Sequence, residues 1–141
     1  MKTSQKGLDI IMLFEGLRLE AYKPVSTEKY YTIGYGHYGS DVIKGMKITA
    51  AQAESYLKKD VVTAEKAVER YAPKGINQNQ FDALVSFTYN CGAGNLRTLC
   101  ANRTIEQVGQ SIKKYNKAGG KVLKGLVRRR EVETLLYFSK E

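Results

Sequence analysis

Apolar residues recur at helical spacing over the longest patterned stretch of this sequence. Between residues 49 and 71 the apolar stripe consists of Ala53, Leu57, Val61, Ala64 and Val68. The pair Thr49 and Gln52 is typical of a capping box at a helix start, and Pro73 and Gly75 supply a stop. The pattern therefore predicts one long helix over residues 49–71.

Further helices are predicted downstream by the same combination of caps and apolar spacing. Residues 77–80 form a second capping pattern, and Gly92 is placed to end the helix that follows. Residues 104–107 repeat the pattern before a shorter apolar stripe. The pair Gly119-Gly120 breaks the chain ahead of a last helix from about 123 to 138.

The N-terminal helix carries an acid on its apolar side. Leu8, Ile11, Met12 and Glu15 stand at positions i, i+3, i+4 and i+7, so the carboxyl group lies on the stripe that faces the core. Burial of a carboxyl group far from any cation favours its protonated form, which can act as a general acid. Alternatively, Gly16 ends the helix and lets the acid reach water, or an arginine pairs with it.

Alternation with a period of two follows at residues 30–38, as expected of a strand with two unlike faces. One set is Tyr31, Ile33, Tyr35 and His37, and the other is Tyr30, Thr32, Gly34, Gly36 and Tyr38. If the strand begins early, Glu28 joins the second set. That side would then offer a carboxylate, a hydroxyl and two glycines. Such glycines serve an ordinary hairpin turn, or they let a backbone or a ligand approach closely.

Three separated blocks of the chain carry a family resemblance. They are EGLRLEAYK at 15–23 with YTIGYGH at 31–37, NQFDALVSFTYNCG at 79–92, and KAGGKV at 117–122 with GLVRRREVE at 125–133. Together they resemble the phage-type lysozymes, the endolysins of glycoside hydrolase family 24, and three blocks in order are far more specific than one short motif.

The resemblance implies an α+β fold in which helices dominate. We expect a single lysozyme-like domain over residues 1–141. Its small β-hairpin lobe, at about 16–48, would be joined by the long helix to a helical lobe made of about 49–141 plus the N-terminal helix.

The activity implied by the resemblance is cleavage of the β-1,4 bond between N-acetylmuramic acid and N-acetylglucosamine in bacterial peptidoglycan, with inversion. Carried over by position, Glu15 matches the general acid, Thr32 the residue that helps hold the attacking water, and His37 the histidine that braces the glutamate. The supporting or substrate-binding positions of the same motif are Tyr22, Gly34 and Gly36.

The second catalytic carboxylate is where this chain departs from the family pattern. Glycoside hydrolysis commonly uses two carboxyl groups. Family members typically carry an Asp where residues 23–26 stand, and no Asp occurs here between residues 9 and 41. Glu28, which shares the parity of Thr32, is the preferred substitute. Glu20 is expected to face solvent on the turn into the sheet. If neither acid serves, a loop hydroxyl could position the water.

An arginine run in the last predicted helix offers a partner for the acid. The family places an arginine near its catalytic glutamate, and position favours Arg129, with Arg128 and Arg130 expected to meet Glu133 or water. A cation near Glu15 would favour the ionised carboxylate and oppose the effect of burial.

Composition and charge narrow the remaining possibilities. The 141 residues can bury a core without disulfides, and Cys91 and Cys100 are expected to be buried free thiols. One histidine and two cysteines make a zinc site improbable, and no metal or cofactor is expected. The net charge of +9 calls for a polyanionic partner, which a bacterial wall provides. No sustained heptad or repeat is present, so a monomer is expected.

Two other functions compete with the hydrolase. A basic, mainly helical domain could bind nucleic acid, although zinc-finger spacing and RNA-binding sheet motifs are missing. A lysozyme fold that has lost an acid could be a non-catalytic peptidoglycan-binding module. The apolar patch at residues 8–14 is too short for a membrane span or a convincing signal peptide. We therefore expect the protein in the host cytoplasm, without membrane insertion, until a phage holin opens the path to the wall.

Overall fold

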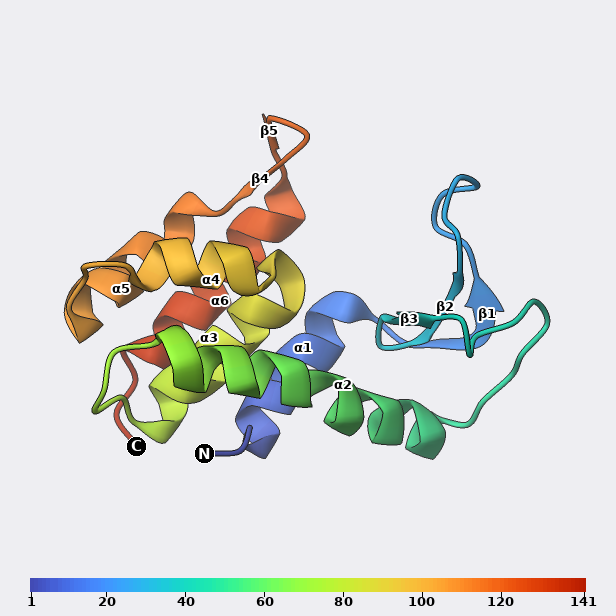
Figure 1. Ribbon diagram of the computed structural model, residues 1–141, viewed down its shortest axis with the longest axis horizontal. Helices are drawn as coiled ribbons and strands as arrows, with labels where there is room; N and C mark the ends of the chain where they lie inside the picture. The colour runs from blue at the N-terminus through green and yellow to red at the C-terminus, as the bar shows by residue number, and fades with distance from the viewer. The chain divides into compact units, whose positions relative to one another are not determined.

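A computed structural model describes residues 1–141, and helices dominate it (Figure 1). In chain order the elements are α1 (Gln5–Glu15), β1 (Arg18–Tyr22), β2 (Tyr31–Gly34), β3 (His37–Gly39), α2 (Ala50–Tyr71), α3 (Gln78–Cys91), α4 (Ala93–Cys100), α5 (Ile105–Ser111), the 3-10 helix η1 (Ile112–Lys114), β4 (Lys117–Ala118), β5 (Lys121–Val122) and α6 (Lys124–Tyr137). The chain divides into two compact units, a sheet unit of residues 11–62 and a helical unit of residues 1–10 and 63–141. The α+β class expected from the sequence is confirmed.

The sheet unit is built on a three-stranded antiparallel sheet in the order β1-β2-β3. Its small core consists of Ile33, Val42, Ile48 and Ala53, with partly buried aromatic and aliphatic side chains around them. Ile33, in the central strand β2, is fully buried. One face of the sheet is therefore committed to the core of this unit, and the opposite face is left for other contacts.

The alternating stretch at residues 30–38 forms two strands of a hairpin, which agrees with the hairpin-turn alternative for its glycines. β2 ends at Gly34, the chain turns at residues 35 and 36, and β3 begins at His37. Gly36, with φ of +85°, lies in the turn, so it does not extend the row of Thr32. Glu28 lies in the loop before β2. The alternation of a strand therefore does not place its side chain on the same face as Thr32.

The backbone conformation at residue 34 explains why the central strand ends in a glycine. Its φ of +67° is a conformation that other residues rarely adopt. A Cβ atom built at this position would lie 3.4 Å from Cβ of Ala53 in α2. That distance is an ordinary van der Waals contact, so the backbone conformation, and not a lack of space, is what favours glycine here.

In the helical unit, α3 is the central element. Asn77 caps its start, with the Gln80 side chain reaching back to the cap, and the Gly92 N–H bonds to the Thr88 carbonyl at its end. The predicted helix bounds are confirmed here, and the capping boxes at residues 49–52 and 104–107 are confirmed as well. The last helix, α6, packs against α3. The short helix α4 was not predicted, because its start has no side-chain cap.

The N-terminal segment is tied to this unit through the buried Asp82 of α3. The Ser4 backbone N–H lies 2.9 Å from one Asp82 oxygen, and the Ser4 hydroxyl donates to the other. A Cβ atom on Gly7 would lie 2.9 Å from Cβ of Asp82, so only glycine allows this approach. These contacts fix where α1 begins. None of the helices has the length and apolar character of a membrane span.

Candidate active site

Glu15 occupies the last turn of α1, where a helix gives way to a strand. The side chain is half-buried. Gly16 follows with φ of +73°, and its N–H donates to the Met12 carbonyl at 3.1 Å, which closes the helix. The strand β1 starts two residues later at Arg18. This corner places Glu15 between the end of α1 and the first strand of the sheet, and the helix end agrees with the sequence prediction.

Thr32 lies in the central strand of the sheet. It is paired with Tyr22 of β1 on one side and with Tyr38 of β3 on the other. Because successive residues of a strand point to opposite faces, Thr32 faces away from the core that buries Ile33. The residue is only 8% exposed. Its hydroxyl therefore has restricted access to solvent, and it lies on the free face of the sheet.

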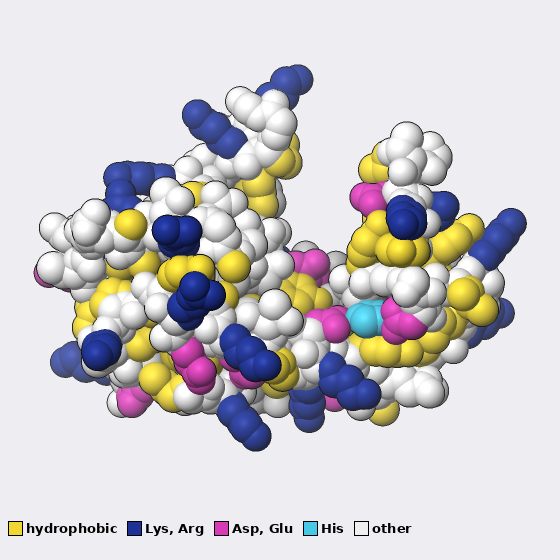
Figure 2. All heavy atoms as spheres, in the orientation of Figure 1, with side chains coloured by type: hydrophobic (Ala, Val, Ile, Leu, Met, Phe, Trp, Pro, Cys, Tyr) yellow, Lys and Arg dark blue, Asp and Glu magenta, His cyan; other side chains and the backbone are white.

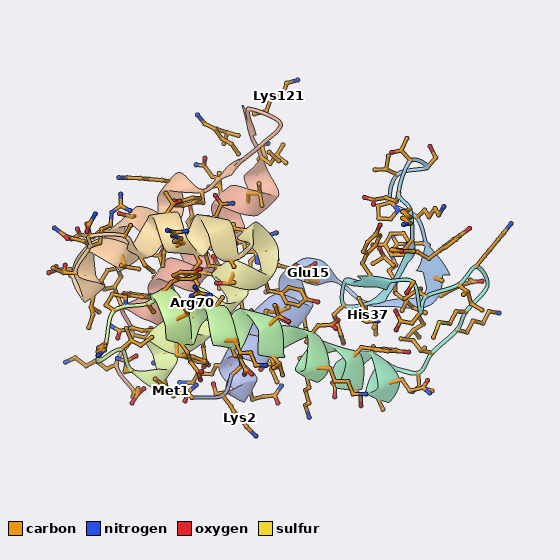
Figure 3. The ribbon with its side chains drawn as sticks, viewed as in Figure 1. Met1, Lys2, Glu15, His37, Arg70 and Lys121 are labelled. Carbon is orange, nitrogen blue, oxygen red and sulfur yellow. The ribbon has the colours of Figure 1, made fainter.

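His37 is held between two carboxylates of the sheet unit. Nδ1 lies 2.8 Å from Oδ2 of Asp60, and Nε2 lies 2.8 Å from Oδ2 of Asp41. The ring stacks on Tyr56 with centroids 4.4 Å apart. Figure 2 shows this single histidine flanked by acidic side chains, and Figure 3 labels its position at the start of β3. Two acids and an aromatic ring thus fix the imidazole, and the predicted bracing of Glu15 stays a prediction.

The electrostatics of this cluster favour the imidazolium form. Burial alone would lower the pKa of His37, but hydrogen bonds and charge attraction from Asp41 and Asp60 outweigh burial and raise the pKa above 6.5. The hydrogen bond from His37 in turn lowers the pKa of Asp41. These ionic hydrogen bonds therefore connect β3 to the following loop and to α2.

The two candidates for the second acid both face solvent. Glu28 lies in the loop between β1 and β2, where its backbone N–H donates to the Val25 carbonyl at 3.0 Å. Glu20 is exposed, as predicted, although it belongs to β1 and makes a bridge to Lys47 instead of lying on a turn. Neither side chain is fixed by a hydrogen bond or an ion pair within the chain, so the loop acid is free to reorient.

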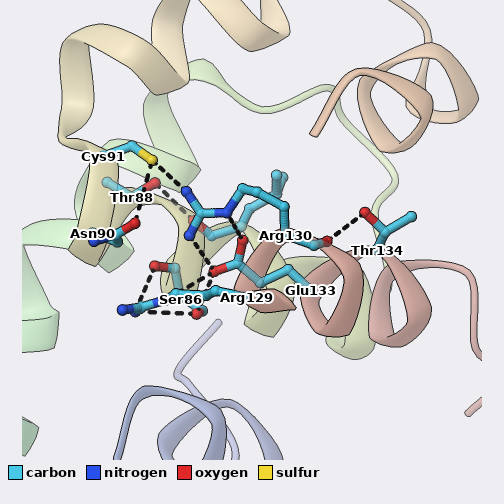
Figure 4. A network of polar contacts seen from close by, with 9 residues as sticks. Ser86, Thr88, Asn90, Cys91, Arg129, Arg130, Glu133 and Thr134 are labelled. Atoms are coloured by element: carbon cyan, nitrogen blue, oxygen red, sulfur yellow. Dashed lines mark hydrogen bonds and ion pairs between the residues drawn. The ribbon is translucent and has the colours of Figure 1, made fainter. Parts of the chain in front are cut away.

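Arg129 belongs to a buried ionic network between α3 and α6 (Figure 4). Its Nε lies 3.3 Å from Oε2 of Glu133, and its Nη2 lies 3.2 Å from the Ser86 carbonyl oxygen. Arg130 pairs more closely with the same acid, with Nε 2.6 Å from Oε1. The Ser86 hydroxyl donates to Oε2 of Glu133 at 2.6 Å. The expected partnership of Glu133 with the arginine run is confirmed, and the predicted approach of Arg129 to Glu15 stays a prediction.

Burial raises the pKa of Glu133, while Arg130, the Ser86 hydroxyl and Arg129 oppose that shift by stabilising the carboxylate. Two guanidinium groups thus converge on one carboxylate that has no access to water. Arg128, by contrast, is exposed. Of the three consecutive arginines, two are structural partners of the core acid, and Arg129 is held in a fixed orientation by it.

Both cysteines are free, and one differs from the expectation. Cys100 is buried, whereas Cys91 is only half-buried and accepts a hydrogen bond from Arg130. The expectation of two buried thiols is therefore wrong for Cys91, because the end of α3 leaves its sulfur beside a cavity of about 410 Å³. The cavity is lined by Asn90, Cys91, Asn95, Lys114, Tyr115, Lys117, Ala118 and Leu126.

The partners of His37 were not foreseen from the sequence. Asp60 and Tyr56 belong to the long helix α2, and Asp60 is 23 positions away from His37 in the sequence. Nothing in the residue spacing of that helix indicates that either side chain contacts the histidine. Asp41 follows His37 by four residues and could have been proposed as a local partner. No three His, Cys, Asp or Glu side chains gather in a group suited to a metal ion.

Comparison with known proteins places this arrangement in a family. The family model described as phage lysozyme matches residues 12–133. An endolysin of Bacillus phage PZA is 49% identical over 145 residues, covering 99% of this chain and 56% of that protein. This chain thus spans about half the length of such curated relatives.

Two solved structures are similar over nearly the whole chain. The muramidase domain of SpmX from Asticaccaulis excentricus has a TM-score of 0.85 at 32% identity and covers 99% of both chains. An endolysin from Escherichia coli O157:H7 phage FAHEc1 has a TM-score of 0.82 at 38% identity, covering 98% of this chain and 94% of that one. Sequence and structure agree, and the chain belongs to the phage lysozyme family.

Proposed function

We propose that this chain hydrolyses the β-1,4 bond between N-acetylmuramic acid and N-acetylglucosamine in bacterial peptidoglycan, as a phage endolysin that lyses its host. The observation that carries the proposal is a half-buried glutamate at the helix-to-strand corner, in a chain of the phage lysozyme family. Similarity to an endolysin and to a muramidase domain supports the same reaction class.

In this mechanism Glu15 protonates the glycosidic oxygen as the bond breaks. Thr32 helps to hold the attacking water, and its low exposure would limit competing solvent at that position. The second acid would activate the water or stabilise positive charge on the sugar. We assign this role to Glu28, because an exposed loop acid without a partner in the chain can turn toward a bound substrate. Glu20, a loop hydroxyl at Ser26 or Thr27, and no second group at all remain as alternatives.

The polyanionic wall is the partner that we propose for the positive charge. Residues 113–128 contain six cations and no acid, and all six side chains are exposed: Lys113, Lys114, Lys117, Lys121, Lys124 and Arg128. They lie on η1, on the start of α6 and on the β4–β5 hairpin, which projects from the helical unit in Figure 1. Attraction between exposed charges is screened by salt, so lysis should weaken as ionic strength rises.

Release of reducing sugar from purified peptidoglycan tests the reaction directly. Wild-type protein should release reducing sugar, and Glu15→Gln should abolish the release. The variant should still show a cooperative thermal unfolding transition, which shows that it is folded. Activity of Glu15→Gln near the wild-type level would overturn the mechanism. Glu28→Gln, with Glu20→Gln as the matched exposed control, then identifies the second acid, since only the participating residue should lower kcat.

The same assay separates the competing functions. A non-catalytic wall-binding module would sediment with peptidoglycan but release no reducing ends, and a nucleic-acid-binding domain would retard DNA without acting on the wall. For an endolysin we expect synthesis in the host cytoplasm and action on the wall after the membrane is opened.

A further inference from the structure

Tyrosine side chains lie on both sides of Thr32 across the free face of the sheet. Thr32 is directly paired with Tyr22 of β1 and with Tyr38 of β3. Directly paired residues of antiparallel strands project from the same face. The three side chains therefore form one row across three strands, on the face opposite the buried Ile33.

A further tyrosine, Tyr30, just before β2, contacts the edge-strand end of this row. The rings of Tyr30 and Tyr38 have centroids 5.5 Å apart and are tilted by 59°. The Tyr30 backbone N–H also lies 3.2 Å from the Tyr38 hydroxyl oxygen. The loop that precedes β2 is thus attached to the edge strand through an aromatic pair, which we call the Tyr30/Tyr38 pair.

Cations lie over two of these tyrosine rings. The Arg18 guanidinium carbon is 4.6 Å from the centre of the Tyr22 ring, and the Lys29 ammonium nitrogen is 5.2 Å from the centre of the Tyr30 ring. Such cation–π contacts hold aromatic rings in place. They also put hydrogen-bond donors beside apolar ring faces, which is the combination that a sugar with apolar C–H faces and many acceptor oxygens can use.

The exposure of the edge tyrosine is not explained by folding. Tyr38 is 45% exposed on an edge strand, so much of a large aromatic surface stays in water instead of contributing to burial. Neighbouring strands lie about 4.8 Å apart, so the three-stranded row alone extends roughly 10 Å, enough to contact more than one sugar of a linear glycan.

We infer that the Tyr30/Tyr38 pair is a sugar-binding platform that positions the glycan strand of peptidoglycan across Thr32. The inference rests on the proposed hydrolase function, and it deepens it by assigning substrate positioning to two tyrosines that lie outside the motif set. Tyr38 supplies the exposed ring, and the Tyr30 ring, which packs against it and lies under Lys29, supports it. Both are positioning residues that contact sugars away from the reacting bond.

The test compares Tyr38→Ala with Tyr38→Phe, which keeps the ring and loses the hydroxyl. Loss of one aromatic contact should raise KM about three- to tenfold while kcat stays within about twofold, because the reacting groups are untouched. Tyr38→Phe should retain the wild-type KM. The matched control is Tyr71→Ala, which removes another tyrosine under an arginine, Arg70, at 5.3 Å, and should leave both constants unchanged.

Binding measured without turnover separates this inference from the proposed reaction. Calorimetry with soluble, uncross-linked glycan strands and the Glu15→Gln protein should give a dissociation constant that Tyr38→Ala raises by the same factor. If wild-type protein releases no reducing sugar, the hydrolase proposal fails, and the calorimetry still decides whether the platform binds glycan. Unchanged affinity and KM in Tyr38→Ala would overturn the inference. A loss in Tyr38→Phe equal to that in Tyr38→Ala would do the same, since the effect would then come from attachment of the loop.

Discussion

Replacing Glu133 by Gln probes the buried network that orients Arg129. The carboxylate is 0% exposed and faces Arg130 at 2.6 Å and Arg129 at 3.3 Å. The substitution keeps the shape and removes the negative charge, so two buried guanidinium groups lose their counter-ion. Breaking a buried ion pair by removing one partner costs about 3–5 kcal/mol.

This cost is large relative to the total stability of a domain, about 5–15 kcal/mol. At a few degrees per kcal/mol for a chain of this size, the melting temperature should fall by roughly 10–20 °C. Ser86→Ala removes only the hydroxyl that donates to Oε2 at 2.6 Å, so we expect a smaller loss of about 1.5–3 kcal/mol.

Thermal and urea unfolding followed by circular dichroism measure both effects. The matched control is Glu131→Gln, which removes the same charge from an exposed position of the same helix and should change stability by less than about 0.5 kcal/mol. If Glu133→Gln and Glu131→Gln unfolded within about 1 kcal/mol of each other, the account of the network as a charge-balanced unit would be refuted.

Three other outcomes follow from local geometry and protonation. Gly34→Ala should cost about 1–2 kcal/mol, because a side chain is strained at φ of +67°. Gly94→Ala, on α4 with open space around it, should instead be neutral to slightly stabilising, because alanine is the better helix former. Equal urea midpoints for the two variants would contradict this. Because the pKa of His37 is raised in the folded protein, its stabilisation is fully present below pH 6.5 and is lost as pH rises through the folded value. The urea midpoint of His37→Gln should therefore fall further below that of the wild type at acidic than at alkaline pH, and a gap that grew with pH would exclude this sign. Burial raises the pKa of Cys91 and raises that of Cys100 to about 11, so at neutral pH a thiol reagent should label Cys91 slowly and Cys100 more slowly still, with fast labelling of both only in urea.

Features set by local sequence were the ones that could be predicted. The capping boxes of α3 and α5 each depend on two residues three positions apart, so sequence spacing alone reveals them. The helix end at Gly16 depends on a single glycine. The parity of Thr32 and Tyr38 was also correct, because three residues, an odd number, separate the paired Ile33 and His37, so that directly paired residues of β2 and β3 keep the same parity.

Features that depend on distant residues could not be predicted. The acids around His37 come from two different segments, and the partner of Gly34 is a helical alanine 19 positions later. The parity of Glu28 failed because the loop before β2 does not continue the strand. The contacts of His37 and Gly34 form only when distant parts of the chain fold against each other, and the spacing of residues along the sequence does not reveal such contacts.

The attachment of Ser4 to Asp82 has a consequence for how the protein forms during translation. The two residues are 78 positions apart, so the N-terminal segment leaves the ribosome well before its partner is made. At typical synthesis rates of about 5–20 residues per second, that interval is roughly 4–16 seconds. Residues 11–62 are complete by then and contain all three strands of their sheet. The sheet unit can therefore fold first on the ribosome, while the first ten residues wait, unprotected, for the rest of the helical unit.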